Sequence, residues 1–154
     1  MTPAVKVAER AGVTFSLHSY DSAPEVESYG LEAAEALGVD PARVFKTLLA
    51  LIDDEPAVAM VPVSMKLDLK ALARASGGKK AVMAEGALAQ RLTGYVLGGI
   101  SPLGQKKRSP LWLDNSVAGL ETLYMSAGRR GLEIEMAPAD LLALTGGRLA
   151  PLSR

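Results

Sequence analysis

The chain contains no cysteine and only one histidine among its 154 residues. Without cysteine it forms no disulfide, offers no thiolate to a metal and has no cysteine nucleophile. With His18 as the single imidazole, it also lacks the residue set from which most zinc sites are built. We therefore expect no protein metal site.

Familiar nucleotide-binding patterns are missing as well. The sequence has neither the GxxxxGK[ST] phosphate loop nor the GxGxxG dinucleotide fingerprint, and Ser101 lies outside any Gly-x-Ser-x-Gly nucleophile elbow. We expect no cofactor, and we interpret Ser101 as a hydrogen-bonding loop residue rather than a nucleophile. No apolar run reaches the roughly 18 residues of a membrane helix, and residues 1–6 lack a signal-peptide hydrophobic region, so we expect a cytoplasmic protein.

The composition is that of an ordinary globular protein, with 49% hydrophobic and 22% charged residues. The length predicts one domain over residues 1–154. The net charge is zero but unevenly distributed. Residues 1–55 hold four Lys/Arg against ten Asp/Glu (−6), residues 56–108 hold nine against two (+7), and residues 109–154 hold four against five (−1). Two alternatives follow: solvated faces of opposite sign, or a basic face that binds an RNA or nucleotide phosphate backbone.

Hydrophobic periodicity predicts short helices and strands in alternation. Thr2, Pro3 and Gly12 are typical of the start and end of a helix, residues 21–30 form a polar loop, and residues 53–56 join two strands as a hairpin. Helices are expected at residues 4–11, 31–37, 69–75, 84–92 and 141–144, and strands at 14–20, 44–52, 57–63, 111–113, 122–126 and 132–136. The short turns favour antiparallel or mixed pairing, so we predict an α/β fold with a mixed, largely antiparallel curved sheet or barrel and short surrounding helices.

Residues 93–108 are the most unusual segment of the chain. They hold four glycines and a proline around Ser101, and they end in Lys106, Lys107 and Arg108. Glycine lets a backbone approach a ligand closely, and N–H groups exposed in such turns form concavities that bind anions. The segment therefore indicates a ligand that carries phosphates.

Lys46 stands in the middle of an apolar strand, residues 44–52, where burial of a cation is costly without a partner. It either faces solvent at a sheet edge, or it points into a cleft and donates hydrogen bonds to a carbonyl or phosphate oxygen. His18 is either a general base or an ordinary strand residue.

A second basic turn spans residues 126–131 and contains Arg129 and Arg130. It is either a hairpin with solvated arginines or a contact for a phosphate or a terminal adenosine, since the planar guanidinium suits such groups. Glu133 and Glu135 follow on one face of the next strand.

Taken together, these segments resemble the YbaK family of aminoacyl-tRNA deacylases, which is related to the editing domain of bacterial prolyl-tRNA synthetases. The resemblance extends to the subgroup of Cys-tRNA(Pro) deacylases. It runs in order through nearly the whole chain and is carried by residues 1–6, 18–20, 44–48, 67–70, 90–95, 98–108 and 126–135.

The resemblance implies a barrel-like mixed fold and a free-standing trans-editing enzyme that removes cysteine from tRNA(Pro), with the substrate thiol as the nucleophile. Lys46 takes the position of the family's essential lysine. Glu133 stands where relatives often have aspartate, and Ala127 replaces a common glycine. The positions implied to line the aminoacyl pocket are Tyr20, Thr47, Gly98, Gly99, Ile100, Ser101, Pro102, Ser126 and Glu133.

The expected partners are the 3′ end of a mischarged tRNA and prolyl-tRNA synthetase, with no role for DNA or a membrane. The candidates for weak, salt-dependent phosphate contacts are Lys79, Lys80, Lys106, Lys107, Arg108, Arg129 and Arg130. Three alternatives remain: the same fold editing another residue such as alanine on tRNA(Pro), a non-catalytic tRNA- or nucleotide-binding module, and a small-molecule binding protein.

Overall fold

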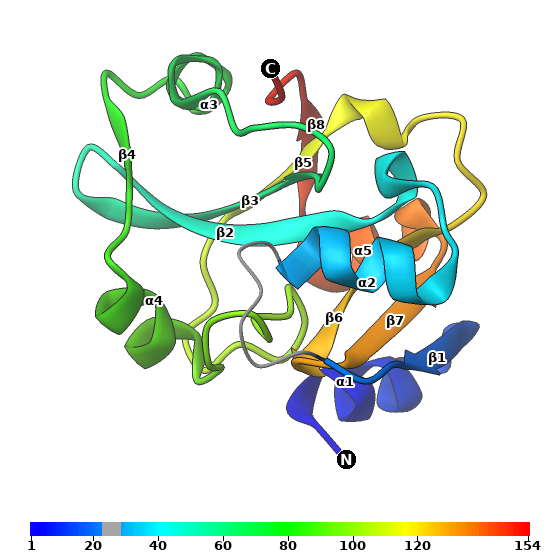
Figure 1. Ribbon diagram of the computed structural model, residues 1–154. Coiled ribbons are helices and arrows are strands. Elements are labelled where there is room, and N and C mark those ends of the chain that lie inside the picture. Colours follow the sequence, from blue (N-terminus) through cyan, green and yellow to red (C-terminus); the bar gives the residue numbers. More distant parts are fainter. Residues whose placement is uncertain (23–28) are drawn as a thin grey trace.

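A long antiparallel hairpin runs across the middle of the molecule (Figure 1). In the computed structural model, which describes residues 1–22 and 29–154, it pairs β2 (Phe45–Ile52) with β3 (Glu55–Pro62). The turn between them consists of Asp53 and Asp54, which have positive φ angles of 48° and 69°. Aspartate tolerates this conformation, and a two-residue turn with positive φ matches the natural twist of a hairpin. The predicted hairpin is confirmed.

The hairpin is the centre of a five-stranded mixed sheet in the order β4-β2-β3-β5-β8. β4 (Ala81–Met83) pairs antiparallel with β2, whereas β5 (Leu111–Asp114) runs parallel to β3 and β8 (Arg148–Ala150) runs parallel to β5.

A second sheet is antiparallel, with β7 (Leu132–Met136) between β1 (Phe15–Ser19) and β6 (Leu123–Arg129). A single parallel bridge from Val44 to Tyr124 links it to the start of β2. Across the described residues the strands thus form two sheets and no closed barrel, which corrects the barrel alternative. The mixed α/β class itself is confirmed.

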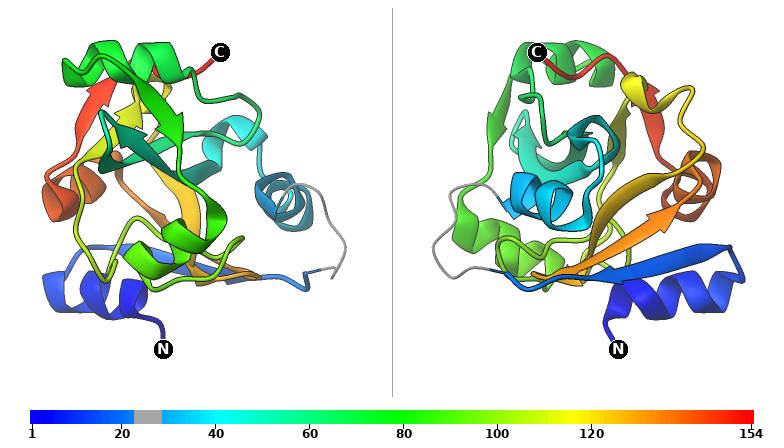
Figure 2. Two further views of the ribbon diagram at one scale, coloured as in Figure 1. Left: turned by 90° about the vertical axis from the view of Figure 1, so that its left-hand side faces the viewer. Right: turned by 45° about the vertical axis from the view of Figure 1, so that its right-hand side comes forward.

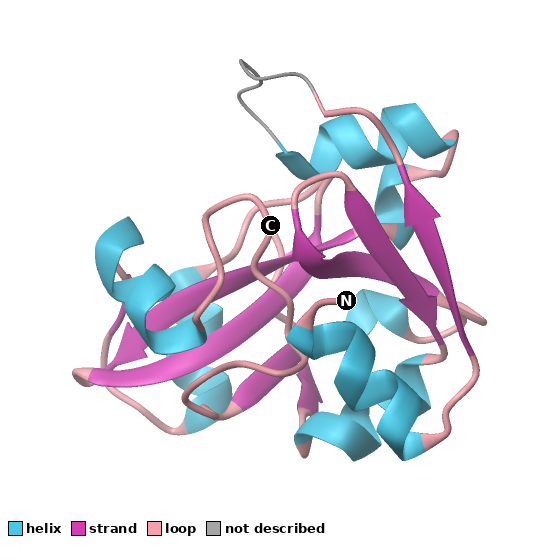
Figure 3. Cartoon of the chain, turned by 90° about the horizontal axis from the view of Figure 1, so that it is seen from below, coloured by secondary structure: helices cyan, strands magenta, loops and turns pink. Residues whose placement is uncertain are grey.

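Five α-helices in the described residues cover these sheets: α1 (Pro3–Ala11), α2 (Tyr29–Leu37), α3 (Leu69–Ser76), α4 (Gly86–Thr93) and α5 (Pro138–Thr145). Figure 2 places α1 beneath the β1-β7-β6 sheet and α3 at the opposite end of the molecule, and Figure 3 shows the helix next to the N-terminus from below. The Thr2 side chain accepts a hydrogen bond from the Val5 N–H, and Gly12 ends α1 in the left-handed conformation, as predicted.

Two hydrophobic cores meet at β2. Phe45 and Leu49 belong to the larger core, with α1, β6 and β7, whereas Leu48 and Ala50 belong to a smaller core with α3 and the C-terminal residues. Successive side chains of a strand point to opposite faces, so β2 packs against one core on each face, while Lys46, Thr47 and Leu48 stay partly exposed. Its continuous apolar sequence follows from this position.

The predicted elements are present, with corrections at their bounds. β4 and β8 were not predicted, since a three-residue strand has too few positions to show periodicity. Tyr29 and Gly30 lie in α2 rather than in the predicted 21–30 loop, whose residues 23–28 lie outside the described residues. α4 starts at Gly86 rather than residue 84. β6 extends to Arg129 through a bulge between Ser126 and Arg129, and the expected tight turn is confirmed at Arg130 and Gly131. No helix of the described part has the length and apolar character required to cross a membrane.

Asp114 ties the C-terminal residues to the sheet. It is 1% exposed, and its carboxylate accepts hydrogen bonds from the N–H groups of Leu152 (2.8 Å), Ser153 (3.0 Å) and Ser116 (3.3 Å), and from the Ser153 hydroxyl (3.1 Å). Burial alone would raise the pKa of this carboxyl, but the hydrogen bonds outweigh burial and lower it.

We predict that Asp114→Asn lowers the free energy of unfolding by about 3 kcal/mol, because the amide carries no charge and presents an N–H₂ group toward backbone donors. Urea unfolding at pH 7 measures the loss. Asp54→Asn, at an exposed turn where asparagine accepts a positive φ, is the matched control and should change stability by less than about 0.5 kcal/mol. Equal losses in both variants would contradict the prediction.

Candidate functional site

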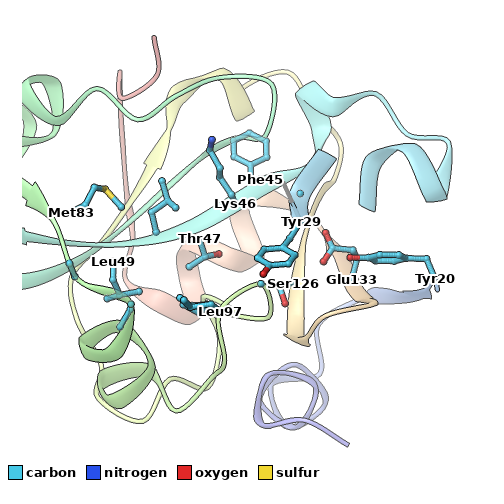
Figure 4. A pocket seen from close by; sticks show the side chains of 17 residues that line it. Tyr20, Tyr29, Phe45, Lys46, Thr47, Leu49, Met83, Leu97, Ser126 and Glu133 are labelled. Atoms are coloured by element: carbon cyan, nitrogen blue, oxygen red, sulfur yellow. The ribbon is translucent and has the colours of Figure 1, made fainter. Parts of the chain in front are cut away.

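A cavity of about 420 Å³ opens beside β2, between α4, residues 97–100 and the β6–β7 hairpin (Figure 4). Its size suits a small organic group such as an amino acid with part of a nucleoside. The walls combine apolar side chains with a few polar ones, and the lining residues are Tyr20, Tyr29, Gly30, Phe45, Lys46, Thr47, Leu48, Leu49, Met83, Ala84, Gly86, Ala89, Leu97, Gly98, Ile100, Ser126 and Glu133.

Lys46 and Thr47 reach the cavity from opposite faces of β2. Figure 4 shows Lys46 rising on one side of the strand and Thr47 on the other. Lys46 is partly buried, and no salt bridge joins its ammonium group to a carboxylate of the described residues. Burial lowers the pKa of Lys46, and the neighbouring charge of Lys66 lowers it further. Lys46 is therefore a partly buried lining residue whose nitrogen lies on the face of β2 opposite Thr47, and the cleft alternative stays a prediction.

The Thr47 hydroxyl is a buried polar group without a partner. Its Oγ1 atom has no hydrogen bond to any described residue. Leaving such a group unsatisfied costs about 1–3 kcal/mol. A hydroxyl kept in this state in a cavity wall can donate to, or accept from, a bound ligand.

Glu133 is the buried acid of the cavity. It lies on β7 and is 5% exposed. Within the described residues its carboxyl takes part in no hydrogen bond or ion pair, and burial raises its pKa to about 8. The pKa of Tyr20 is also raised, first by its own burial and then by the nearby Glu133. In Figure 4 the Tyr20 hydroxyl and the Glu133 carboxyl lie side by side.

The glycine segment forms one wall because its backbone packs closely on its neighbours. Gly98 has a φ of +86°, and a Cβ there would lie 2.9 Å from the Tyr29 ring. A Cβ on Gly99 would lie 2.7 Å from the Arg129 Cα, which cannot move away as a flexible side chain could. The Gly99 N–H donates to the Val96 carbonyl at 3.0 Å, while the N–H groups of Gly98 and Ile100 have no recorded hydrogen bond to the described residues.

The structure brings most of the expected pocket residues together. Tyr20, Lys46, Thr47, Gly98, Ile100, Ser126 and Glu133 all line the cavity. Gly99 and Ser101 are buried behind the wall, where the Ser101 hydroxyl accepts from the Leu103 N–H at 3.2 Å. Pro102 instead lines a separate cavity of about 210 Å³.

The predicted phosphate-binding cations divide into two groups. The exposed ones are Lys79, Lys80, Lys106, Lys107, Arg108 and Arg129. Arg130 is different: its guanidinium lies 4.4 Å from the centre of the Tyr29 ring and 3.4 Å from the Glu32 carboxylate. These contacts hold the start of α2 against the β6–β7 hairpin, so Arg130 helps to build the pocket wall.

The lining also contains residues that were not anticipated from the sequence, among them the exposed Tyr29, Met83 and Leu97. These three are more than a third exposed; Tyr29 and Met83 come from segments that lack a functional motif, whereas Leu97 lies in the glycine segment directly before residues 98–102. An exposed apolar side chain has no signature in a single sequence. Its place at a pocket appears only once the chain has folded.

His18 lies outside the cavity lining. Its Nε2 atom is 2.9 Å from the Glu135 carboxylate, which also accepts from the Thr122 hydroxyl and lies 3.6 Å from Arg43. Within residues 1–22 and 29–154, no three histidine, cysteine or acidic side chains are grouped so that they could hold a metal ion.

The sequence of this chain is similar to those of known proteins. The family model described as "aminoacyl-tRNA editing domain" matches residues 23–144. An Enterococcus faecalis protein named as a proposed Cys-tRNA(Pro)/Cys-tRNA(Cys) deacylase, EbsC, is 38% identical over 154 residues, which cover 99% of this chain and 93% of that protein.

Solved structures share the fold. A protein described as a proposed trans-editing enzyme for prolyl-tRNA synthetase superimposes with a TM-score of 0.85 at 24% identity, covering 100% of this chain and 99% of the other. A second structure, described only as a hypothetical protein, gives a TM-score of 0.88 at 24% identity and 99% coverage of both chains.

The raised pKa of Glu133 predicts a specific dependence of stability on pH. An unfolded glutamate titrates near 4.3, so the contribution of Glu133 to the free energy of unfolding is complete below about pH 4 and falls by about 1.4 kcal/mol per pH unit until pH 8. Glu133→Gln cannot titrate. We expect it to unfold with nearly the same dependence as wild type below pH 4 and to become progressively more stable than wild type up to pH 8.

Urea unfolding at pH 4, 6 and 8 measures this difference. Glu121→Gln, at an exposed position, is the control and should follow wild type at every pH. A Glu133→Gln advantage that does not change between pH 4 and pH 8 would rule out a buried, uncompensated carboxyl.

Proposed function

This chain belongs to the aminoacyl-tRNA editing domain family, and we propose that residues 1–154 act as one trans-editing deacylase that removes cysteine from mischarged Cys-tRNA(Pro). The name of the E. faecalis relative supports the substrate. The observation that carries the proposal is a cavity of amino-acid size whose walls offer hydrogen-bonding groups but no cysteine or histidine side chain.

Among the described residues, the cavity walls lack a side chain that is an activated nucleophile, so we propose that the substrate supplies the nucleophile. The chain has no cysteine, and His18 lies outside the lining. The hydroxyls of Ser126 and Thr47 lack an imidazole that could activate them. The substrate thiol is a better nucleophile than either hydroxyl at neutral pH.

The proposed reaction proceeds in two steps. The cysteine sulfur attacks its own ester carbonyl carbon, the bond from that carbon to the ribose oxygen breaks, and the thiol proton goes to the departing ribose oxygen. This step releases tRNA and a four-membered thiolactone. Water then adds to the thiolactone carbonyl and opens the ring to free cysteine. The protein contributes positioning and stabilises negative charge on the carbonyl oxygen.

The groups available for that stabilisation are the Lys46 ammonium, the Thr47 hydroxyl and the N–H groups of Gly98 and Ile100. All come from residues that line the cavity, and none has a recorded hydrogen bond to the described residues in the free protein. Lys46 would donate to the ester carbonyl or to an oxygen of the terminal nucleotide. Gly99 would not take part, because its N–H is bonded to Val96.

Selection of the tRNA would come largely from a partner, for which we propose prolyl-tRNA synthetase. The solved structure of a proposed trans-editing enzyme for that synthetase shares this fold. The exposed Lys106, Lys107 and Arg108 could meet the tRNA backbone, and contacts of this kind weaken steeply as salt rises.

We predict that Lys46→Ala lowers kcat for deacylation of Cys-tRNA(Pro) by about 10²–10³-fold, the usual effect of removing one donor to a developing oxyanion. The measurement is single-turnover hydrolysis of radiolabelled Cys-tRNA(Pro), with folding checked by circular dichroism. Lys70→Ala, an exposed lysine on α3, is the matched control and should keep wild-type activity. Near-normal turnover by Lys46→Ala would overturn the assigned role.

A substrate panel tests the proposed nucleophile. Serine is nearly isosteric with cysteine but carries a far weaker nucleophile, so we predict fast release of cysteine and slow release of serine, alanine and proline from the same tRNA(Pro). Single-turnover rates on the four aminoacyl-tRNAs give the comparison. Equal rates for cysteine and serine would indicate an activated water instead.

A further inference from the structure

The cavity contains an acidic side chain, Glu133, that is not paired with another group of the described residues. Glu133 is 95% buried, since only 5% of it is exposed, and its carboxyl takes part in no hydrogen bond or ion pair within the described residues. Asp114, the other buried aspartate or glutamate of the described part, accepts four hydrogen bonds. A buried carboxyl without partners is destabilising. Its position in a cavity wall therefore suggests that a bound ligand donates a hydrogen bond or a positive charge to it.

The groups around Glu133 do not supply a positive charge to it. Tyr20, directly after β1, and Tyr29 on α2 carry phenol groups. The partners of Glu133 across the strands are Ser126 on β6 and His18 on β1, and the His18 Nε2 atom lies 2.9 Å from Glu135. Arg130, in the β6–β7 turn, contacts the Glu32 carboxylate and the Tyr29 ring. On β7 itself, Glu135 shares the face of Glu133 but is bonded to His18 and Thr122.

The cavity therefore has an acidic side and a basic side, and it becomes electrically polar when Glu133 ionises. Glu133 lies on one side, and Lys46 lies across β2 from Thr47, with Lys66 near enough to lower its pKa (Figure 4). The end of an aminoacyl-tRNA is polar in the same way, because the only cation of its aminoacyl group is the α-ammonium, whereas its nucleotides carry phosphates. Charge complementarity orients the amino acid toward Glu133 and the nucleotides toward the lysines.

We propose that Glu133 is the receptor for the α-ammonium group of the esterified amino acid, and that the site thereby selects free aminoacyl esters and rejects N-acylated ones. The inference rests on the proposed function, since it assumes an aminoacyl ester in this cavity. It adds a specificity that neither the thiol nor the lysine provides, because peptidyl and formylaminoacyl esters of tRNA carry no ammonium group.

Binding of the ammonium also moves a proton. Burial raises the pKa of Glu133 to about 8 in the free protein, so the carboxyl holds a proton at pH 6. An α-amino group, with an ordinary pKa of about 8, is charged at that pH. Formation of the ion pair stabilises the carboxylate and lowers its pKa, and the displaced proton passes to the buffer.

The first test compares two substrates that both keep the thiol. Wild type is assayed on Cys-tRNA(Pro) and on N-acetyl-Cys-tRNA(Pro) with a free thiol. We expect kcat/KM to be lower for the acetylated substrate by about 10–100-fold, the range for a charge-assisted hydrogen bond. Glu133→Gln should lose activity on Cys-tRNA(Pro) by a similar factor and remain unchanged on the acetylated substrate.

The outcomes separate this inference from the proposed function. If wild type cleaves neither substrate, the proposed function fails. If wild type cleaves both at equal rates, the deacylase stands and the receptor role of Glu133 is wrong. A Glu133→Gln variant that loses the same factor on both substrates would also contradict it, because a structural or proton-transfer role does not depend on the α-amino group.

The second test measures the displaced proton with a stable ligand, cysteine linked by an amide to 3′-amino-3′-deoxyadenosine. Calorimetric titrations at pH 6 in two buffers of different ionisation enthalpy give the number of protons released. We expect about one proton for wild type and none for Glu133→Gln. Glu135→Gln is the matched control on the same strand and should release the same number as wild type. Binding by wild type without proton release would overturn the inference.

Discussion

Packing of β2 against a core on each face is the constraint on which the site depends. Phe45 and Leu49 are held in the larger core, and Leu48 and Ala50 in the smaller one, so the strand cannot rotate or shift by one residue without exposing a core. Lys46 and Thr47 follow the same alternation and therefore reach the cavity from opposite faces. Their relative position is fixed by the packing of their apolar neighbours. The backbone from which the flexible Lys46 side chain extends is therefore held in place.

The two buried acids of the described residues, Asp114 and Glu133, differ in their hydrogen bonding and in the direction of their pKa shifts. Asp114 accepts four hydrogen bonds, which outweigh its burial and lower its pKa, and it holds the C-terminal residues on β5. Glu133 has no such bonds, and burial raises its pKa to about 8. The unpartnered Thr47 hydroxyl lies in the same cavity. Polar groups left unsatisfied reduce stability, and their concentration in one cavity is typical of a site prepared for a ligand.

The cations divide between two tasks. Arg43 lies against Thr122, Glu135 and the Tyr124 ring, and Arg130 lies against Glu32 and the Tyr29 ring, so both join secondary-structure elements, and the Arg130 cluster does so at the cavity. Lys79, Lys80, Lys106, Lys107 and Arg108 remain exposed. The arginines use their planar, multidentate geometry to join elements, whereas the exposed, predominantly lysine set presents point charges to solvent, where a polyanion can reach them.

Local sequence was enough for the capped helix α1, the β2–β3 hairpin, the mixed α/β class and the family, because each depends on neighbouring residues: a capping threonine and glycine, an aspartate turn between apolar runs, and an ordered set of motifs. The family resemblance also implied that Lys46, Glu133 and the glycine segment are parts of one pocket. The sequence could not show that Tyr29, Met83 and Leu97 complete the walls, that Arg130 is engaged in the fold, or that Glu133 lacks a partner. Those facts depend on which groups from distant segments come into contact. Burial, pKa and charge complementarity are set by such contacts, which only the tertiary structure determines.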